Sequence, residues 1–166
     1  FLIACLTIAG IPPLSGFFSK DEILVAAFEH NKVIFGVQWL VAGITAFYMF
    51  RLYFNIFWNN TPDYHHTPHE SPATMTIPLL ILAFASIFSG FVPFHDLVTT
   101  DGSPLHTDFH WMIAVPSVLI AVVGIAVAAA LYYRKNSRPE TISNKLKTLY
   151  NMAYRKFYID ELYLFI

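Results

Sequence analysis

The sequence has few of the residues on which soluble enzymes usually depend. It contains one cysteine, Cys5, so no disulfide framework can form, and only 13% of its 166 residues are charged, where soluble domains average about 25%. It also lacks a Cys-x-x-Cys pair, a glycine-rich phosphate loop and a Ser/His/Asp grouping, which excludes the common redox and hydrolase motifs. The net charge of −1 gives no support for nucleic-acid binding.

Apolar residues dominate instead: 56% of the chain is hydrophobic and 17% is aromatic. Crossing a hydrocarbon core of about 30 Å takes about 20 apolar residues, and residues 33–58, 73–94 and 111–133 each meet that length. Arg51 is the one charged residue in these three segments. Their ends carry tryptophan and tyrosine, as the membrane interface favours. The sequence therefore predicts an all-α membrane protein with three continuous transmembrane helices.

Residues 1–30 predict a different kind of span, a discontinuous transmembrane helix with its break near residues 10–18. A regular helix cannot continue through Gly10, Pro12, Pro13 and Gly16, and we assign Pro12 and Pro13 to holding the break open. The Ser19-Lys20-Asp21-Glu22 run fits a capping box and predicts that the helix restarts near Ser19. Because the chain opens with Phe1 in an apolar run, we expect it to be a piece of a longer protein.

Positive charge is concentrated after residue 133. The seven residues concerned are Arg134, Lys135, Arg138, Lys145, Lys147, Arg155 and Lys156. The opposite side, formed by the 30–32 turn and an outer loop over 95–110, has only Lys32. Since positive residues are retained on the cytoplasmic side, the C-terminal segment and the loop over 59–72 are predicted to face the cytoplasm or matrix. Residues 139–166 have the amphipathic spacing of a cytoplasmic interfacial helix.

The three adjacent charges Lys20, Asp21 and Glu22 are predicted to lie near the middle of the membrane. Ten helical residues from Lys20 to His30 rise about 15 Å, about half of the hydrocarbon thickness. An unpaired ionisable group there costs from about 3 to more than 10 kcal/mol, which makes it a candidate functional site. Lys20 is our candidate for proton exchange, because the proton affinity of a desolvated lysine depends on nearby charge, such as that of a carboxylate.

A structural interpretation of the same cluster stays open. Ser19 and Glu22 would cap a helix, the helix dipole would favour Asp21, and Lys20 would extend to water. We assign Glu22 to the cap in either case.

Two other polar groups favour structural interpretations. Arg51 lies near the cytoplasmic edge, where its side chain can reach the interface. The triplet His65, His66 and His69 with Glu70 lies in a proline-rich loop without a second ligand cluster, so we expect a solvated loop and no metal site.

The run Gly-Ile-Pro-Pro-Leu-Ser-Gly-Phe-Phe-Ser-Lys-Asp-Glu-Ile-Leu, residues 10–24, resembles the broken helix of the antiporter-like subunit 5 family of respiratory complex I. The resemblance continues in Thr-Ala-Phe-Tyr-Met-Phe-Arg at 45–51, Pro-His-Glu-Ser-Pro at 68–72 and Phe-Tyr-Ile-Asp-Glu-Leu-Tyr at 157–163. It covers nearly the whole chain in the family's order, and it matches the C-terminal part of that family, where the last residues lead into a long lateral helix.

The resemblance implies a function. The chain would be a fragment of a proton-translocating, multi-pass subunit of NADH:quinone oxidoreductase in the bacterial or mitochondrial inner membrane, with Lys20 as a proton carrier and Asp21 as its neighbour on the outward route. It would bind no cofactor or metal, since NAD, FMN, iron–sulfur clusters and quinone belong to partner subunits. Other membrane subunits, above all the neighbouring antiporter-like ones, would be its partners.

Two groups of relatives share the Gly-Phe-Phe-Ser-Lys pattern, so alternatives remain. These are the Mrp-type cation/proton antiporters and the membrane subunits of energy-converting hydrogenases. A passive membrane scaffold is a third alternative.

Overall fold

The computed structural model describes residues 1–58, 70–92, 110–133 and 138–165. These residues form helices only, with no strand among them. Three helices are long and apolar enough to cross a membrane: Lys32–Phe57, Ala73–Phe91 and Trp111–Tyr132. The predicted all-α membrane class is confirmed.

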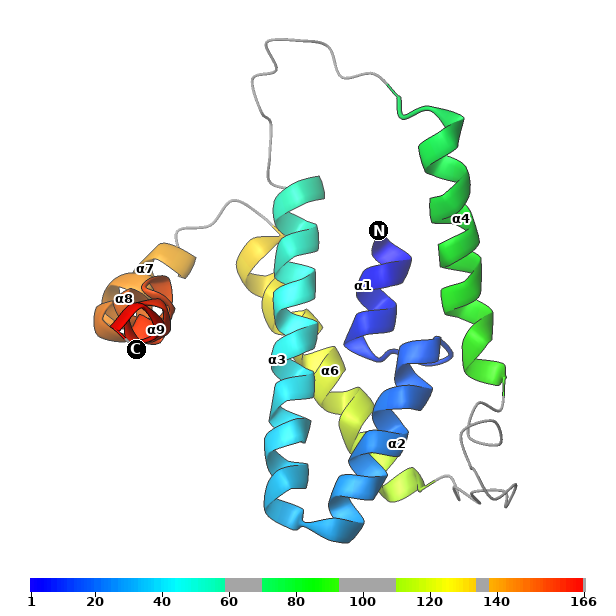
Figure 1. The fold of residues 1–166 in the computed structure, drawn as a ribbon, viewed down its shortest axis with the longest axis horizontal. Helices are drawn as coiled ribbons and strands as arrows, with labels where there is room; N and C mark the ends of the chain where they lie inside the picture. The colour runs from blue at the N-terminus through cyan, green and yellow to red at the C-terminus, as the bar shows by residue number, and fades with distance from the viewer. Residues whose placement is uncertain (59–69, 93–109, 134–137, 166) are drawn as a thin grey trace.

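The first two helices form the interrupted span. Helix α1 (Leu2–Ala9) and helix α2 (Ser15–His30) follow one another in the same general direction, and the chain turns between them near mid-height of the bundle (Figure 1). Their 8 and 16 residues add up to a rise of about 36 Å, enough to match the hydrocarbon core.

The predicted capping box at Ser19 and Glu22 is wrong. Helix α2 begins at Ser15, after Leu14, whose side chain forms no cap. Backbone bonds from Leu14 N–H to the Ile11 carbonyl (3.1 Å) and from Phe17 N–H to the Leu14 carbonyl (3.0 Å) close the turn instead. Ser19 and Glu22 therefore lie inside α2, with both side chains exposed on the described structure.

Helix α3 (Lys32–Phe57) packs against α6 (Trp111–Tyr132), which runs in the same general direction (Figure 1), through small residues. Gly43 and Ala46 of α3 meet Ala121, Gly124 and Ala128 of α6. A Cβ atom on Gly124 would lie 2.5 Å from the Gly43 carbonyl oxygen, so the two backbones touch there. Close approach of small residues is the usual basis of helix association in lipid.

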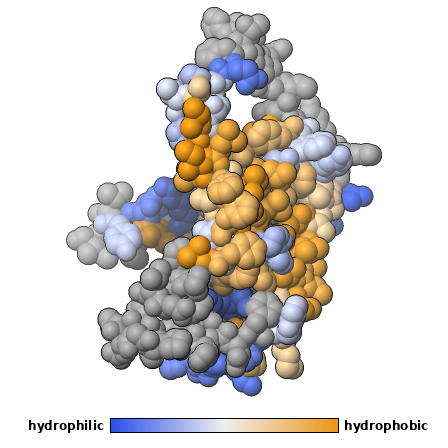
Figure 2. Space-filling view, turned by 90° about the vertical axis from the view of Figure 1, so that its right-hand side faces the viewer, coloured by the Kyte–Doolittle hydropathy of each residue, from blue (hydrophilic) through white to orange (hydrophobic). Residues whose placement is uncertain are grey.

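Helix α4 (Ala73–Phe88) and the 3-10 turn η1 (Ser89–Phe91) lie at the edge of the bundle. None of the α4 residues is buried against the described part of the chain, and Leu79 and Leu80 are more than half exposed. Figure 2 views this side and shows a broad apolar surface. A continuous surface of this kind suits contact with lipid or with further helices.

The C-terminal segment lies to one side of the bundle (Figure 1). It is helical but divided into α7 (Arg138–Lys145), α8 (Lys147–Tyr154), η2 (Lys156–Tyr158) and α9 (Ile159–Phe165). Lys156, Phe157 and Tyr158, which follow the end of α8, have φ of 49°, 55° and 58°, a left-handed backbone that redirects the chain.

Candidate functional site at the helix break

The C-terminal end of α1 closes around Gly10. Its N–H donates to the carbonyls of Leu6 and Thr7 at 3.1 and 3.0 Å, and the Ile11 N–H donates to Leu6 at 3.1 Å. With Gly10 at φ 80°, this is a Schellman arrangement, which glycine adopts without steric cost. The Ile8 carbonyl would normally accept from residue 12, but Pro12 has no N–H.

Lys20 supplies the missing donor. Its Nζ lies 2.5 Å from the carbonyl oxygen of Ile8. The ammonium therefore lies at the negative end of the α1 dipole, a position that favours a cation. Within the described residues Lys20 forms no ion pair. The break thus creates the acceptor that holds Lys20, and the charge and the interruption form one structural unit.

Two glycines make room for this arrangement. A Cβ on Gly10 would lie 2.9 Å from Cδ of Lys20, so a side chain there would displace the lysine. A Cβ on Gly16 would lie 1.9 Å from the Thr7 carbonyl oxygen. The start of α2 therefore lies directly against the backbone of α1, which only glycine permits.

Lys20 also lines a small pocket between α2 and α3, with a volume of about 190 Å³. Its other lining residues are Ile23, Leu24, Gln38, Val41, Ala42 and Thr45. The Thr45 hydroxyl donates to the Val41 carbonyl at 2.7 Å. The Gln38 side-chain oxygen, Oε1, is buried and has no hydrogen-bond partner among the described residues.

Asp21 points away from Lys20, since adjacent helical residues do not face each other. Its side chain is 7% exposed, and its Oδ1 is buried without a hydrogen-bond partner in the described part of the chain. The His110 imidazole, at the start of α6, is close enough to act electrostatically on its carboxyl group. The two predicted residues thus face different sides of α2.

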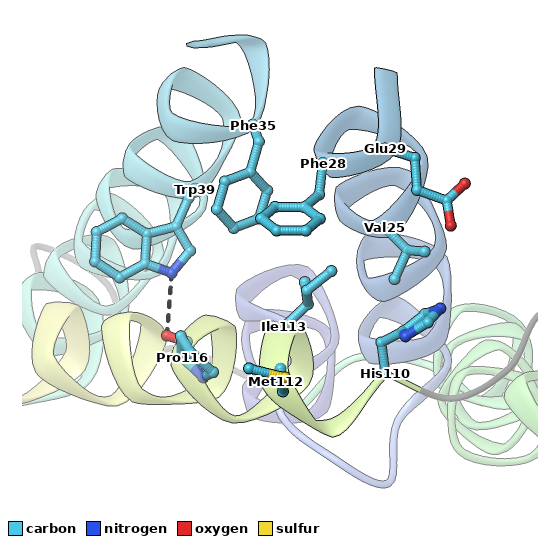
Figure 3. Close-up of a pocket in the computed structure, with 9 residues that line it drawn as sticks. All are labelled: Val25, Phe28, Glu29, Phe35, Trp39, His110, Met112, Ile113 and Pro116. Carbon is cyan, nitrogen blue, oxygen red and sulfur yellow. Dashed lines mark hydrogen bonds between the residues drawn. The ribbon is translucent and has the colours of Figure 1, made fainter. Parts of the chain in front are cut away.

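A larger cavity of about 480 Å³ lies between α2, α3 and the start of α6, toward the end of the bundle that carries the α2–α3 turn (Figure 3). Phe28 and Phe35 meet edge to face, and the Trp39 indole N–H donates to the Pro116 carbonyl at 3.1 Å. Most of the lining is apolar, and Glu29 and His110 supply its ionisable groups. Val25 lines it one helical turn beyond Asp21.

The other polar groups have local roles or lie elsewhere. The Arg51 guanidinium is exposed and lies 5.2 Å from the ring centre of Tyr132, a cation–π contact consistent with a structural role. His65, His66 and His69 lie outside the described residues. Among the residues described, no three His, Cys, Asp or Glu side chains group as metal ligands.

Gln38 was not singled out by the sequence patterns. Its signal was present, because it is the only glutamine in the chain and it lies in an otherwise apolar segment. Its place in the same pocket as Lys20 depends on how α2 and α3 pack, which no local pattern specifies.

Residues 1–46, which contain the whole broken span, match the family model "NADH:quinone oxidoreductase/Mrp antiporter, TM". A Synechocystis protein, NAD(P)H-quinone oxidoreductase chain 5, is 35% identical over 98% of this chain and 31% of its own length. The corresponding Picosynechococcus protein is 36% identical over 98% of this chain and 30% of its own length. The chloroplastic subunit 5 of Mesostigma viride is 36% identical over 100% of this chain and 28% of its length. The chain thus spans less than a third of these curated relatives.

Proposed function

Because the chain belongs to the chain 5 family of NAD(P)H-quinone oxidoreductases, we propose that it is part of a proton-translocating membrane subunit in which Lys20 carries the proton. The observation that carries the proposal is the position of the Lys20 ammonium on the open carbonyl end of α1, at the break in the span. The redox reaction would take place elsewhere in the complex and drive this movement.

Lys20 suits proton exchange because its surroundings stabilise its charged form only in part. The Ile8 carbonyl and the α1 dipole favour the ammonium, but one acceptor satisfies one of its three N–H groups. A change in nearby charge, such as arrival of a positive charge from earlier helices of the full subunit, would therefore favour proton release. The return of a negative charge would favour uptake.

Asp21 is our candidate for the outward side of the route. Its buried carboxyl lies within electrostatic reach of His110, whose side chain lines the larger cavity near the α2–α3 turn (Figure 3). On this outward side a proton would pass between Asp21 and His110.

The chain is a multi-pass membrane protein, and the alternation of its helices supports the predicted orientation. The α2–α3 turn and the start of α6 lie at one end of the bundle, while the end of α3 and the start of α4 lie at the other (Figure 1). With the lysine and arginine bias, the end of α3 would lie on the cytoplasmic or matrix side of the inner membrane, together with α7–α9.

The relatives' names support the proposed partners and cofactors. These proteins are chains of NAD(P)H-quinone oxidoreductases, so this chain would assemble with other membrane subunits, including neighbouring antiporter-like ones. NAD(P)H, flavin, iron–sulfur clusters and quinone would be bound by those partners.

A second candidate function is cation/proton exchange. The matched family model covers Mrp antiporters as well as the oxidoreductases, and it covers the part of the chain that holds Lys20. The relatives that match almost the whole chain are oxidoreductase subunits, which favours the first function.

The test is a Lys20→Ala substitution in the full-length subunit of the assembled complex. We expect proton pumping, followed with a pH-sensitive dye in proteoliposomes during quinone reduction, to fall by at least about tenfold, the scale on which positioned proton-transfer groups act. Lys32→Ala is the matched control, because Lys32 lies at the α2–α3 turn over the Phe28 ring and should leave pumping unchanged. Unchanged pumping by an assembled Lys20→Ala complex would leave only a structural role for Lys20, as in a passive scaffold.

A further inference from the structure

The end of α4 lies against the start of α2, although the two are distant in the sequence (Figure 1). The contact is made by η1, where a Cβ on Gly90 would lie 2.9 Å from Cα of Ser15 and 2.5 Å from Cδ2 of the Phe18 ring. The ring of Phe91 meets that of Phe18 edge to face, with 5.6 Å between the ring centres. The turn η1 therefore touches the main chain of α2 at its first residue, and glycine at position 90 permits this close approach.

The first turn of α2 is held from two sides. Successive helical residues are about 100° apart, so Gly16 and Lys20 share one face of α2. Ser15 and Phe18 lie together on a nearly opposite face. The face of Gly16 and Lys20 meets the C-terminal end of α1, while that of Ser15 and Phe18 meets η1. The first turn of α2 thus lies between the end of α1 and the end of α4.

This arrangement makes the contact between Lys20 and Ile8 dependent on η1. No side chain caps the start of α2, since Leu14 forms no cap hydrogen bond. The main-chain bond from Phe17 N–H to the Leu14 carbonyl closes the turn but does not hold it against α1. Without η1 behind it, the start of α2 could tilt away from α1, and Lys20 Nζ would then lose its acceptor on Ile8.

We propose that η1 is a positioning element for proton transfer, with Gly90 and Phe18 as positioning residues that hold Lys20 on the Ile8 carbonyl. The inference rests on the proposed function of Lys20. Neither Gly90 nor Phe18 exchanges a proton, and both act by fixing the start of α2 against α1. A movement of α4 would reach Lys20 through this contact, which gives α4 a role beyond that of a membrane span.

The test is Gly90→Ala in the full-length subunit of the assembled complex, where the added Cβ would push η1 away from Ser15 and Phe18. We expect the number of protons pumped per quinone reduced to fall several-fold, because Lys20 loses its acceptor. Gly36→Ala is the matched control, since the same methyl group meets nothing within 4 Å there, and it should stay within twofold of the unaltered complex. A merely structural contact would lower the amount of complex or its thermal midpoint and leave this ratio unchanged, which would overturn the inference.

Phe18→Ala tests the same contact by removal. The ring that meets Phe91 is lost, so η1 no longer holds the start of α2, and we expect a similar fall in protons pumped per quinone reduced. Phe84→Ala is the control, because Phe84 is 63% exposed on α4 and its ring meets Phe88 of the same helix. A normal ratio in Phe18→Ala, or an equal loss in Phe84→Ala, would overturn the inference.

Comparison with Lys20→Ala separates this inference from the proposed function. Normal pumping by Gly90→Ala and Phe18→Ala together with a loss in Lys20→Ala would overturn the positioning role of η1 and leave the proposed function standing. Normal pumping by all three variants would overturn both. Should Gly90→Ala fail to assemble, Phe18→Leu decides, because it keeps an apolar side chain and removes only the ring: a several-fold loss of pumping supports the inference, and normal pumping contradicts it.

Discussion

The interrupted span and the α3–α6 pair differ in how their main-chain carbonyls find hydrogen-bond donors in apolar surroundings. Helix α3 satisfies its backbone internally, and so does α6 apart from the one N–H that Pro116 lacks. The two helices associate through alanine and glycine, and no charged residue takes part in that contact. The α1–α2 span leaves the Ile8 carbonyl open and places Lys20 on it. Both depend on close backbone approach at a glycine, Gly124 in the first and Gly16 in the second.

The difference shows where a membrane helix can carry charge. An ammonium in apolar surroundings needs an acceptor, and a continuous helix has none to spare because its carbonyls bond four residues ahead. A break made by Gly10 and Pro12 frees the Ile8 carbonyl and adds the negative end of a helix dipole. The continuous helices therefore form the packed part of the bundle, and the interrupted span provides the polar site.

Gly16→Ala should give the largest effect, because the added Cβ would lie 1.9 Å from a backbone carbonyl oxygen that cannot rotate away. We expect α1 and α2 to separate, with a loss of about 3 kcal/mol of stability and a marked loss of pumping. The measurement is the thermal midpoint of the purified complex together with dye-detected pumping. Gly36→Ala is the control, since a Cβ there meets nothing within 4 Å. Equal stability of the two variants would contradict the close contact between α1 and α2.

Gly124→Ala should give a smaller and different effect. Its Cβ would lie 2.5 Å from the Gly43 carbonyl oxygen, so α3 and α6 must move apart slightly, at a cost of about 1–2 kcal/mol. Because Lys20 and its acceptor lie outside this contact, the pH dependence of pumping should not change. The measurement is the same pair of thermal midpoint and pumping profile. A shifted pH profile in Gly124→Ala would show that the α3–α6 contact affects the polar site at the helix break.

Much of the fold was predictable because its signals are local. Apolar runs of sufficient length identified the three continuous helices, and Gly10, Pro12 and Pro13 identified the interruption. The candidate residues Lys20 and Asp21 followed from charge in an apolar segment. Whether they act in proton translocation stays a prediction.

The features that were missed depend on contacts between distant residues. The start of α2 at Ser15 is set by a backbone turn and by the approach of Gly16 to Thr7, while the Ser-x-x-Glu pattern at Ser19 suggested a later start. The acceptor for Lys20 is a main-chain oxygen twelve positions earlier, which has no side-chain signature. Gln38 comes to line the same pocket as Lys20 only when α3 packs on α2.

The most direct test of the central claim is the pumping activity of Lys20→Arg in the assembled complex. Arginine can keep a positive charge on the Ile8 carbonyl, but it does not release its proton under physiological conditions. If the break serves proton exchange, pumping by Lys20→Arg should be as low as that of Lys20→Ala, while the complex assembles normally. Pumping close to that of the unaltered complex would contradict the account, because a fixed charge at the break would then be sufficient.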